Sequence, residues 1–225
     1  MKITIVGATG RVGRLVLEQA TDAGHDVTAG HDVTAVARDT TRLPPTVRAF
    51  AVDLASTDRA ALESAVDGAD AVLSCLGPTS KAEVGIVTTG TTAIVEAMHA
   101  VGSRWLVVIS ASPVATLSTP GSPTPARDPG EGFLMRTVAV PLMKRVFANQ
   151  YADLAAMEVV VKGSGLEWTI MRPPRLTDKP STDYRMAIGH NAPHGASISR
   201  SALAQAMLDV IGNPDTIHSP VGAAE

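Results

Sequence analysis

The chain opens with MKITIVGATGRVGRLVLEQA at residues 1–20, and this stretch carries the strongest signal for a fold. A strand-like apolar run, Ile3–Val6, leads into glycines at positions 7, 10 and 13, and an amphipathic helix pattern follows them. Glycines allow a tight turn and a close backbone approach, and a helix N-terminus offers amide donors and positive dipole to a pyrophosphate. Because strand, turn and helix follow in the required order, the motif predicts a βαβ unit that binds a dinucleotide. A glycine turn that binds nothing is the alternative.

Strand-like and helix-like segments alternate along the whole chain, which is typical of βαβ units and a parallel sheet. The expected strands are Ile3–Val6, Val33–Ala37, Arg48–Val52, Ala71–Ser74, Trp105–Ile109 and Trp168–Met171. The expected helices are Arg11–Ala23, Arg59–Val66, Val84–Ala100, Ala152–Lys162 and Ser201–Ile211. Six strands with right-handed crossovers predict an α/β fold with a doubly wound parallel Rossmann sheet, in a single domain over residues 1–225.

The composition limits the classes of protein to consider. The 225 residues suffice for one α/β domain, and with 45% apolar but only 3% aromatic residues the core is mainly aliphatic, which suits a sheet buried on both faces. A net charge of −3 offers no basic surface for nucleic acid or an anionic membrane, and no apolar run reaches membrane-spanning length. With one cysteine, and a strand in place of a signal peptide at Met1, we expect a cytoplasmic monomer or small homo-oligomer.

Residues 113–148 interrupt the alternation. Pro, Gly, Ser and Thr are frequent from Pro113 to Gly132, which predicts an exposed loop, and the apolar residues from Phe133 to Phe147 predict a helix after it. The segment follows the fifth strand at its C-terminal end, where doubly wound folds bind ligands. We expect a loop and a small cap over the substrate side, with a plain surface loop as the alternative.

A hexapeptide, GHDVTA, occurs twice in succession, at residues 24–29 and 30–35. Six residues are too few for a repeat module, so the pair is interpreted as a local duplication. Only the second copy runs directly into Val36 and Ala37, so we place the strand there and expect the first copy to enlarge a surface loop.

Deletion of residues 24–29 is therefore expected to leave the melting temperature and the cofactor affinity nearly unchanged, because a change in loop length costs little entropy. Thermal denaturation and cofactor titration of the shortened chain test this. Loss of soluble, cooperative folding would show that the first copy carries structure of its own.

The end of the second strand indicates which dinucleotide is bound. An acidic residue there accepts the ribose hydroxyls of NAD, whereas arginine accommodates the 2′-phosphate of NADP. The strand ends in Arg38, and Arg42 follows one turn later. A planar guanidinium can bind phosphate through two hydrogen bonds, so the sequence favours NADP(H). Asp39 keeps the NAD alternative open, and a solvent-exposed arginine without a ligand is the structural alternative.

Two further strand ends add candidate cofactor contacts. After the third strand, the carboxylate of Asp53 can meet the adenine amino group while Leu54 packs on the ring. After the fourth strand, Leu76 and Gly77 follow, and the glycine lets a cofactor lie close to the backbone. Cys75 just before them is interpreted as a packed core thiol and not a redox centre.

Several stretches together resemble the atypical short-chain dehydrogenase/reductase family, over nearly the whole chain. They are GATGRVG at 7–13, VARDTTRLP at 36–44, AVDLA at 51–55, LSCLG at 73–77, VVISAS at 107–112 and SGLEWTIMRPPRLTD at 164–178. Within the family, the chain is most similar to NmrA-like NAD(P)H-binding proteins and to NADPH-dependent flavin reductase, also called biliverdin reductase B. The stretch with both arginines points more narrowly to the latter.

The usual catalytic pair of the wider family is missing. Its proton donor is a tyrosine with a lysine four residues later, but Tyr151 is followed at that spacing by Ala155 and Tyr184 by Ile188. This departure argues against carbonyl reduction and sugar epimerisation. The resemblance places the active-site serine at Ser112, whose hydroxyl can bond the nicotinamide amide or the substrate; a small residue that simply fits the strand end is the alternative.

The segment after the sixth strand resembles the part of the family that flanks the nicotinamide. Pro173 and Pro174 fix its backbone, and Arg175 can face an anionic acceptor. The predicted catalytic residue is Ser112. The predicted cofactor-binding residues are Gly7, Thr9, Gly10, Arg11, Val12, Gly13, Arg38, Arg42, Asp53, Leu54, Leu76, Gly77 and Pro173.

These observations predict an NADPH-dependent reductase that transfers a hydride to a small-molecule acceptor such as a flavin or a quinone. A conjugated ring delocalises charge, so the protein mainly has to orient two rings and exclude water. The alternative is an NmrA-like regulatory protein that senses NADP(H) without turnover.

Other polar residues are given no catalytic role. His190 and His194 are four apart, but Pro193 lies between them and no third ligand is evident, so we expect no metal site. Asp153 and Glu158 are expected to be solvated helix carboxylates.

Overall fold

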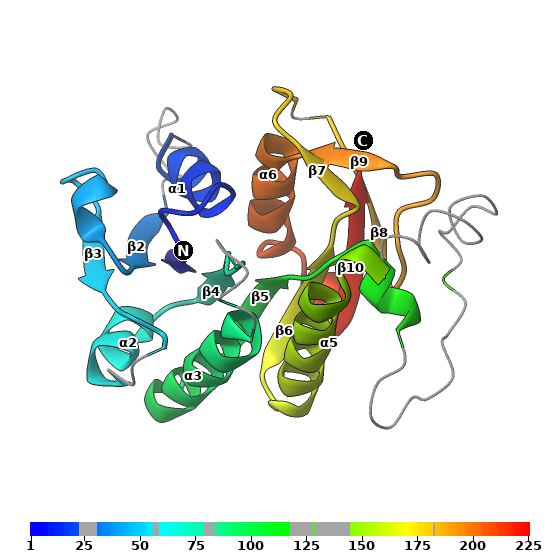
Figure 1. Ribbon diagram of the computed structural model, residues 1–225. Coiled ribbons are helices and arrows are strands. Elements are labelled where there is room, and N and C mark those ends of the chain that lie inside the picture. Colours follow the sequence, from blue (N-terminus) through cyan, green and yellow to red (C-terminus); the bar gives the residue numbers. More distant parts are fainter. Residues whose placement is uncertain are drawn as a thin grey trace.

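The computed structural model describes residues 1–22, 31–55, 59–78, 83, 85–117, 128, 145–181 and 183–225. Its described residues form one eight-stranded sheet flanked by helices on both faces (Figure 1), with a separate two-stranded ribbon. The strand order of the sheet is β3-β2-β1-β4-β5-β6-β10-β8. Strand order reverses between β1 and β4, as in doubly wound sheets, so the predicted Rossmann-type fold in a single domain is confirmed.

The six predicted strands are all present, within one residue of the expected bounds. They are β1 (Lys2–Val6), β2 (Asp32–Ala37), β3 (Arg48–Ala51), β4 (Ala71–Ser74), β5 (Trp105–Ile109) and β6 (Glu167–Arg172). All five pairings among them are parallel, so their C-terminal ends share one edge of the sheet.

The prediction of six strands is incomplete, because four further strands follow β6 in the described part of the chain. They are β7 (Arg175–Thr177), β8 (Arg185–Ile188), β9 (Ser197–Ser199) and β10 (Ser219–Ala224). β10 extends the sheet in parallel with β6, β8 adds an antiparallel edge, and β7 pairs with β9. Proline and glycine weaken a strand pattern, and both occur in β10. β7 and β9 are too short to show alternation.

In the described part of the chain, five α-helices cover the two faces of the sheet (Figure 1). They are α1 (Gly13–Asp22), α2 (Arg59–Val66), α3 (Ile86–Val101), α5 (Ala148–Gly163) and α6 (Arg200–Val210). α1 begins two residues later than predicted, because Arg11 and Val12 belong to the glycine turn. α5 begins four residues earlier than predicted.

Two apolar layers hold the helices to the sheet. One layer joins α1 and α6 to one face, and the other joins α2, α3 and α5 to the opposite face. β5 serves both, since Val107 belongs to the first layer while Leu106 and Val108 belong to the second. Alternate side chains of a strand point to opposite faces, so an aliphatic run is buried throughout.

Strand β2 uses the second copy of the duplicated hexapeptide, as predicted. Asp32 pairs with Lys2 of β1, and the register continues to Val36 opposite Val6. The first copy, residues 24–29, lies outside the described residues. So does most of the expected cap, residues 118–127 and 129–144, which therefore stays a prediction.

Within the described ranges, none of the helices combines the length and apolar character that a membrane-spanning segment requires.

Candidate functional site

A cleft lies at the edge of the sheet where the parallel strands end. It has a volume of about 310 Å³ and is bordered by the turns that follow β1, β2, β3 and β4. Nine of the predicted cofactor-binding residues line it: Gly7, Thr9, Gly10, Arg38, Arg42, Asp53, Leu54, Leu76 and Gly77. Residues from four separate turns therefore meet in one cleft, at the place where doubly wound folds bind ligands.

The glycine turn after β1 brings the backbone of α1 against the strand. Gly7 has a φ of +79°, which side-chain-bearing residues rarely adopt. A Cβ at Gly13 would lie 2.2 Å from the carbonyl oxygen of Gly7, so only glycine fits there. The first turn of α1 consequently starts next to the cleft, where its amides and dipole suit a pyrophosphate.

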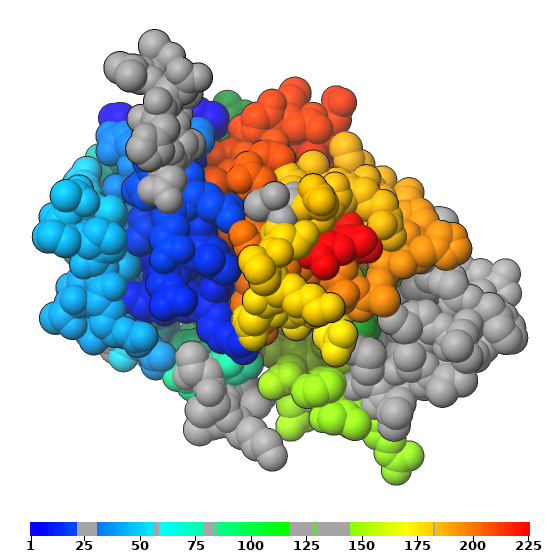
Figure 2. Space-filling model, turned by 90° about the horizontal axis from the view of Figure 1, so that it is seen from above, coloured from blue at the N-terminus to red at the C-terminus, as the bar shows by residue number. Residues whose placement is uncertain are grey.

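Three residues predicted from the same turn lie beside the cleft but outside its lining. Val12 is only 9% exposed and packs in the core, and Gly13 has the packing role just given. Arg11 is exposed and forms an ion pair with Asp178, 2.5 Å from Nη2 to Oδ2. This contact joins the N-terminal turn to the segment after β7, and the blue and yellow parts lie against each other in Figure 2.

The end of β2 contributes both predicted arginines to the cleft. Arg38 follows the strand directly, and Arg42 closes a short 3₁₀ turn, Thr40–Arg42. Asp39, the residue that kept the NAD alternative open, caps that turn by accepting from the backbone N of Thr41 at 3.0 Å. Hydrogen bonds from the Thr41 hydroxyl and amide lower the pKa of Asp39. Asp39 thus shapes the turn that carries Arg42.

A fourth charged residue of the lining, Glu83, was not predicted. The carboxylate of Glu83 lies 2.8 Å from Nη1 of Arg38, across the cleft from the end of β2. The two residues are 45 positions apart, and no local pattern in the sequence links them.

Cys75 borders the cleft from the end of β4. Burial raises the pKa of its thiol to about 12. A thiol needs to be a thiolate to act as a nucleophile, so this environment agrees with the prediction of a packed, unreactive cysteine.

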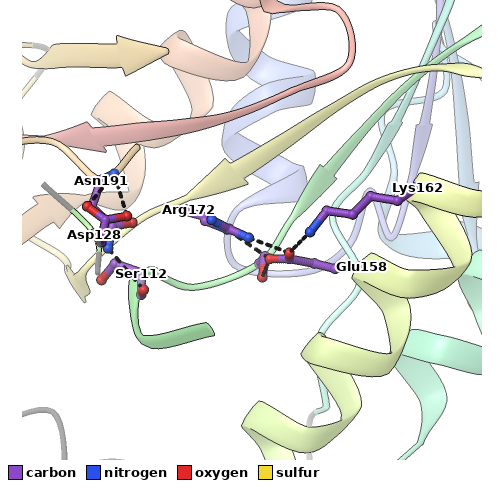
Figure 3. A network of polar contacts seen from close by, with 7 residues as sticks. Ser112, Asp128, Glu158, Lys162, Arg172 and Asn191 are labelled. Atoms are coloured by element: carbon purple, nitrogen blue, oxygen red, sulfur yellow. Dashed lines mark hydrogen bonds and ion pairs between the residues drawn. The ribbon is translucent and has the colours of Figure 1, made fainter. Parts of the chain in front are cut away.

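Ser112 lies at the same edge of the sheet, just beyond β5. It begins a 3₁₀ helix, η4 (Ser112–Thr116), and its amide donates to the carbonyl oxygen of the buried Pro173 at 2.9 Å. Nδ2 of Asn191 donates to the Ser112 carbonyl at 3.1 Å, and the Asn191 amide lies 3.1 Å from both carboxylate oxygens of Asp128 (Figure 3). The backbone of Ser112 is therefore fixed from two sides.

The sequence profile of the family described as NAD(P)H-binding matches residues 7–214. The chain belongs to this NAD(P)H-binding family. The match covers the glycine turn, both arginines, Ser112 and Pro173. The predicted resemblance to NAD(P)H-binding proteins is thereby confirmed at the level of the family.

Solved structures share the fold of this NAD(P)H-binding chain. The oxidoreductase ylbE from Lactococcus lactis is 20% identical with a TM-score of 0.77, covering 100% of this chain and 91% of that one. A Streptococcus pneumoniae protein called an NADH-flavin reductase is 17% identical with a TM-score of 0.73, covering 100% and 99%. A short-chain dehydrogenase/reductase from Veillonella parvula, solved in complex with NADP, is 21% identical with a TM-score of 0.71, covering 100% and 94%. At these identities the likeness shows the fold.

The prediction that Asp153 and Glu158 are solvated is wrong, since they are 8% and 2% exposed. The carboxylate of Asp153 accepts backbone N–H groups of Gly85, Val87 and Thr88 at 3.0–3.2 Å, and so caps the N-terminus of α3. Buried carboxylates require such partners. Both acidic side chains of α5 therefore face the protein interior and not the solvent.

Glu158 forms the centre of a buried ionic network (Figure 3). Its carboxylate accepts from Nε and Nη2 of Arg172 at 2.9 and 2.5 Å, and from Lys162 at 2.8 Å. Oγ of Ser110 donates to the same carboxylate at 2.7 Å. Burial alone would raise the pKa of Glu158, but the hydrogen bonds and charges of Arg172 and Lys162 outweigh it and lower that pKa. The network ties α5 to the ends of β5 and β6.

Both tyrosines have pKa values above their ordinary range. Burial raises the pKa of Tyr151, which packs against Val114 and Ala155. Burial and a hydrogen bond to Asp209 raise the pKa of Tyr184. Neither environment prepares a tyrosine to act as the activated acid of the wider family.

Metal ligands are not assembled in the part of the chain that the structure describes, where no group of three or more His, Cys, Asp or Glu side chains is placed to hold an ion. His190 instead contacts the carbonyl of its neighbour Asn191 through Nδ1 at 2.8 Å.

Proposed function

We propose that this NAD(P)H-binding protein is an NADPH-dependent reductase that transfers a hydride to a flavin, a quinone or a similar conjugated acceptor. The observation that carries the cofactor choice is the presence of Arg38 and Arg42 together in the cleft that the glycine turn borders. Arginine binds phosphate through a planar fork of donors, and an unphosphorylated ribose would not need two such groups.

The residues present fit a dinucleotide along the whole cleft. A Cβ at Gly7 would stand 3.1 Å from the carbonyl oxygen of Cys75, so glycine lets the turn after β1 pack closely against the end of β4, and both border the cleft. The turn at Gly7 and Gly10 would hold the pyrophosphate, and Arg38 with Arg42 the 2′-phosphate. The carboxylate of Asp53, which also accepts from the amide of Ala55 at 3.0 Å, lies where an adenine amino group could donate to it.

When bound, NADPH supplies the hydride. The side chains then have to orient the acceptor and keep water away from it. Ser112 can orient the acceptor, because hydrogen bonds to Pro173 and Asn191 fix its backbone just after the end of β5. Its hydroxyl is then available to bond the acceptor or the nicotinamide amide. No tyrosine with a lowered pKa is present to donate a proton, so an acceptor whose ring delocalises charge, protonated by solvent, suits the site best.

NADPH oxidation measured across acceptors tests the proposal. FMN or a quinone should be reduced far faster than a simple ketone or aldehyde, since a positioned general acid contributes about 10²–10⁴-fold and is lacking here. Ser112→Ala should lower kcat/KM by about tenfold, the usual effect of losing one hydrogen bond of about 1.4 kcal/mol. Tyr151→Phe and Tyr184→Phe should each keep most of the activity.

Two results would change the assignment. If a tyrosine replacement abolished turnover while Ser112→Ala had no effect, the proposed site would be wrong. If NADPH bound but none of the flavins, quinones, tetrapyrroles and aldehydes tested were reduced, the NmrA-like sensing role would replace the reductase.

A further inference from the structure

The guanidinium of Arg38 already has a partner within the cofactor cleft. Its Nη1 lies 2.8 Å from Oε1 of Glu83, and both residues line the cleft. The side chain of Glu83 is 23% exposed, while that of Arg38 is 62% exposed. The acidic partner is thus the more enclosed member of the pair, and the arginine keeps much of its surface toward solvent.

A 2′-phosphate would compete with this carboxylate. The phosphate carries a charge of about −1.5 to −2 and would take the same donors of Arg38, so the guanidinium must leave Glu83 or be shared with it. Either way, two anions come close together in one cleft, which opposes binding. A ribose with a free 2′-hydroxyl meets no such repulsion, because a hydroxyl can donate a hydrogen bond to a carboxylate.

We propose that Glu83 is a specificity-determining residue that holds Arg38 and thereby limits the preference for NADPH over NADH. This inference rests on the proposed 2′-phosphate site at Arg38 and Arg42. Arg42, carried by the 3₁₀ turn that Asp39 caps, supplies a second guanidinium for the phosphate. Cofactor choice then depends on a balance between two arginines and one carboxylate from distant parts of the chain.

Equilibrium titration with 2′,5′-ADP and 5′-AMP tests the inference without any turnover, because the two probes differ only in the 2′-phosphate. Glu83→Gln should tighten 2′,5′-ADP binding by about five- to tenfold, the range expected for removal of a partly screened charge, and leave 5′-AMP binding unchanged. The matched control is Glu96→Gln. It removes the same charge from an ion pair of the same 2.8 Å length, between Arg59 and Glu96, and should change neither affinity.

Arg38→Gln separates this inference from the proposed cofactor choice. If Arg38→Gln weakens 2′,5′-ADP binding but Glu83→Gln leaves it unchanged or weaker, the 2′-phosphate site stands and the role of Glu83 is refuted. If the unmodified protein shows no preference between the probes and Glu83→Gln creates one, the inference holds and the preference for NADPH is refuted. If neither the unmodified protein nor Glu83→Gln distinguishes the two probes, the role of Glu83 and the preference for NADPH are both refuted.

Discussion

Glu158→Gln is expected to lower the free energy of unfolding by about 3–5 kcal/mol, the usual cost of removing one partner from a buried ion pair. The side chain of Arg172 is 9% exposed, so without the carboxylate its charge would stay buried and unpaired. Ser110 would keep a hydrogen-bond acceptor in the glutamine oxygen, but the charge compensation would be lost. Urea denaturation followed by circular dichroism measures the change.

Two further variants show whether burial of the ion pair causes the loss of stability expected for Glu158→Gln. Glu167→Gln removes one partner of an exposed pair with Arg104, 2.6 Å long, and should cost less than about 1 kcal/mol. Combining Glu158→Leu with Arg172→Met removes both charges and should be less destabilising than Glu158→Gln alone. If Glu158→Gln and Glu167→Gln had equal, small effects, the network would not have the role assigned to it.

The same network predicts a loss of stability in acid. Because the pKa of Glu158 is lower in the folded protein than its ordinary value of 4.5, the folded state holds the proton less tightly than the unfolded state does. The stabilisation is therefore fully present above pH 4.5 and is lost as the pH falls toward and through the folded-state pKa. Glu158→Gln should lose this part of the pH dependence.

The fold could be predicted from the sequence because its main signals are local. The glycine turn between β1 and α1 is contiguous, and each buried parallel strand is a continuous aliphatic run. β10 was missed since Pro220 and Gly222 interrupt its pattern, and it becomes a strand only through pairing with β6 and β8. Tertiary pairing of this kind leaves little trace in a single sequence.

The cleft could also be predicted from local signals, but the ion pairs at this edge of the sheet could not. Arg38 and Asp53 follow strand ends that local patterns locate, so their convergence at one edge follows from a parallel sheet. Glu83 pairs with Arg38 over 45 positions, and Glu158 with Arg172 over 14. One signal was present: Arg172 directly follows the buried Ile170 and Met171, and a charge at the end of such a strand requires a buried partner.

Gly13→Ala is expected to lower the free energy of unfolding by about 3 kcal/mol, at the upper end for overpacking, and to weaken dinucleotide binding by about tenfold or more. The added Cβ would lie 2.2 Å from the Gly7 carbonyl oxygen and 2.9 Å from its carbon, and neither backbone atom can turn aside as a side chain could. Alanine favours a helix over glycine by about 1 kcal/mol, which offsets only part of the cost. The first turn of α1 must then move away from β1, and with it the proposed pyrophosphate site.

The control is Gly163→Ala, at the last residue of α5, where an added Cβ would meet no atom within 4 Å. That variant should keep the 2′,5′-ADP affinity of the unmodified protein and raise its free energy of unfolding by no more than about 1 kcal/mol, through the higher helix propensity of alanine. Chemical denaturation and titration of both variants therefore distinguish the close contact at Gly13 from a general effect of replacing a helical glycine. If Gly13→Ala matched Gly163→Ala in both measurements, the approach of α1 to the strand would not depend on a missing side chain, and the steric basis of the proposed dinucleotide cradle would have to be abandoned.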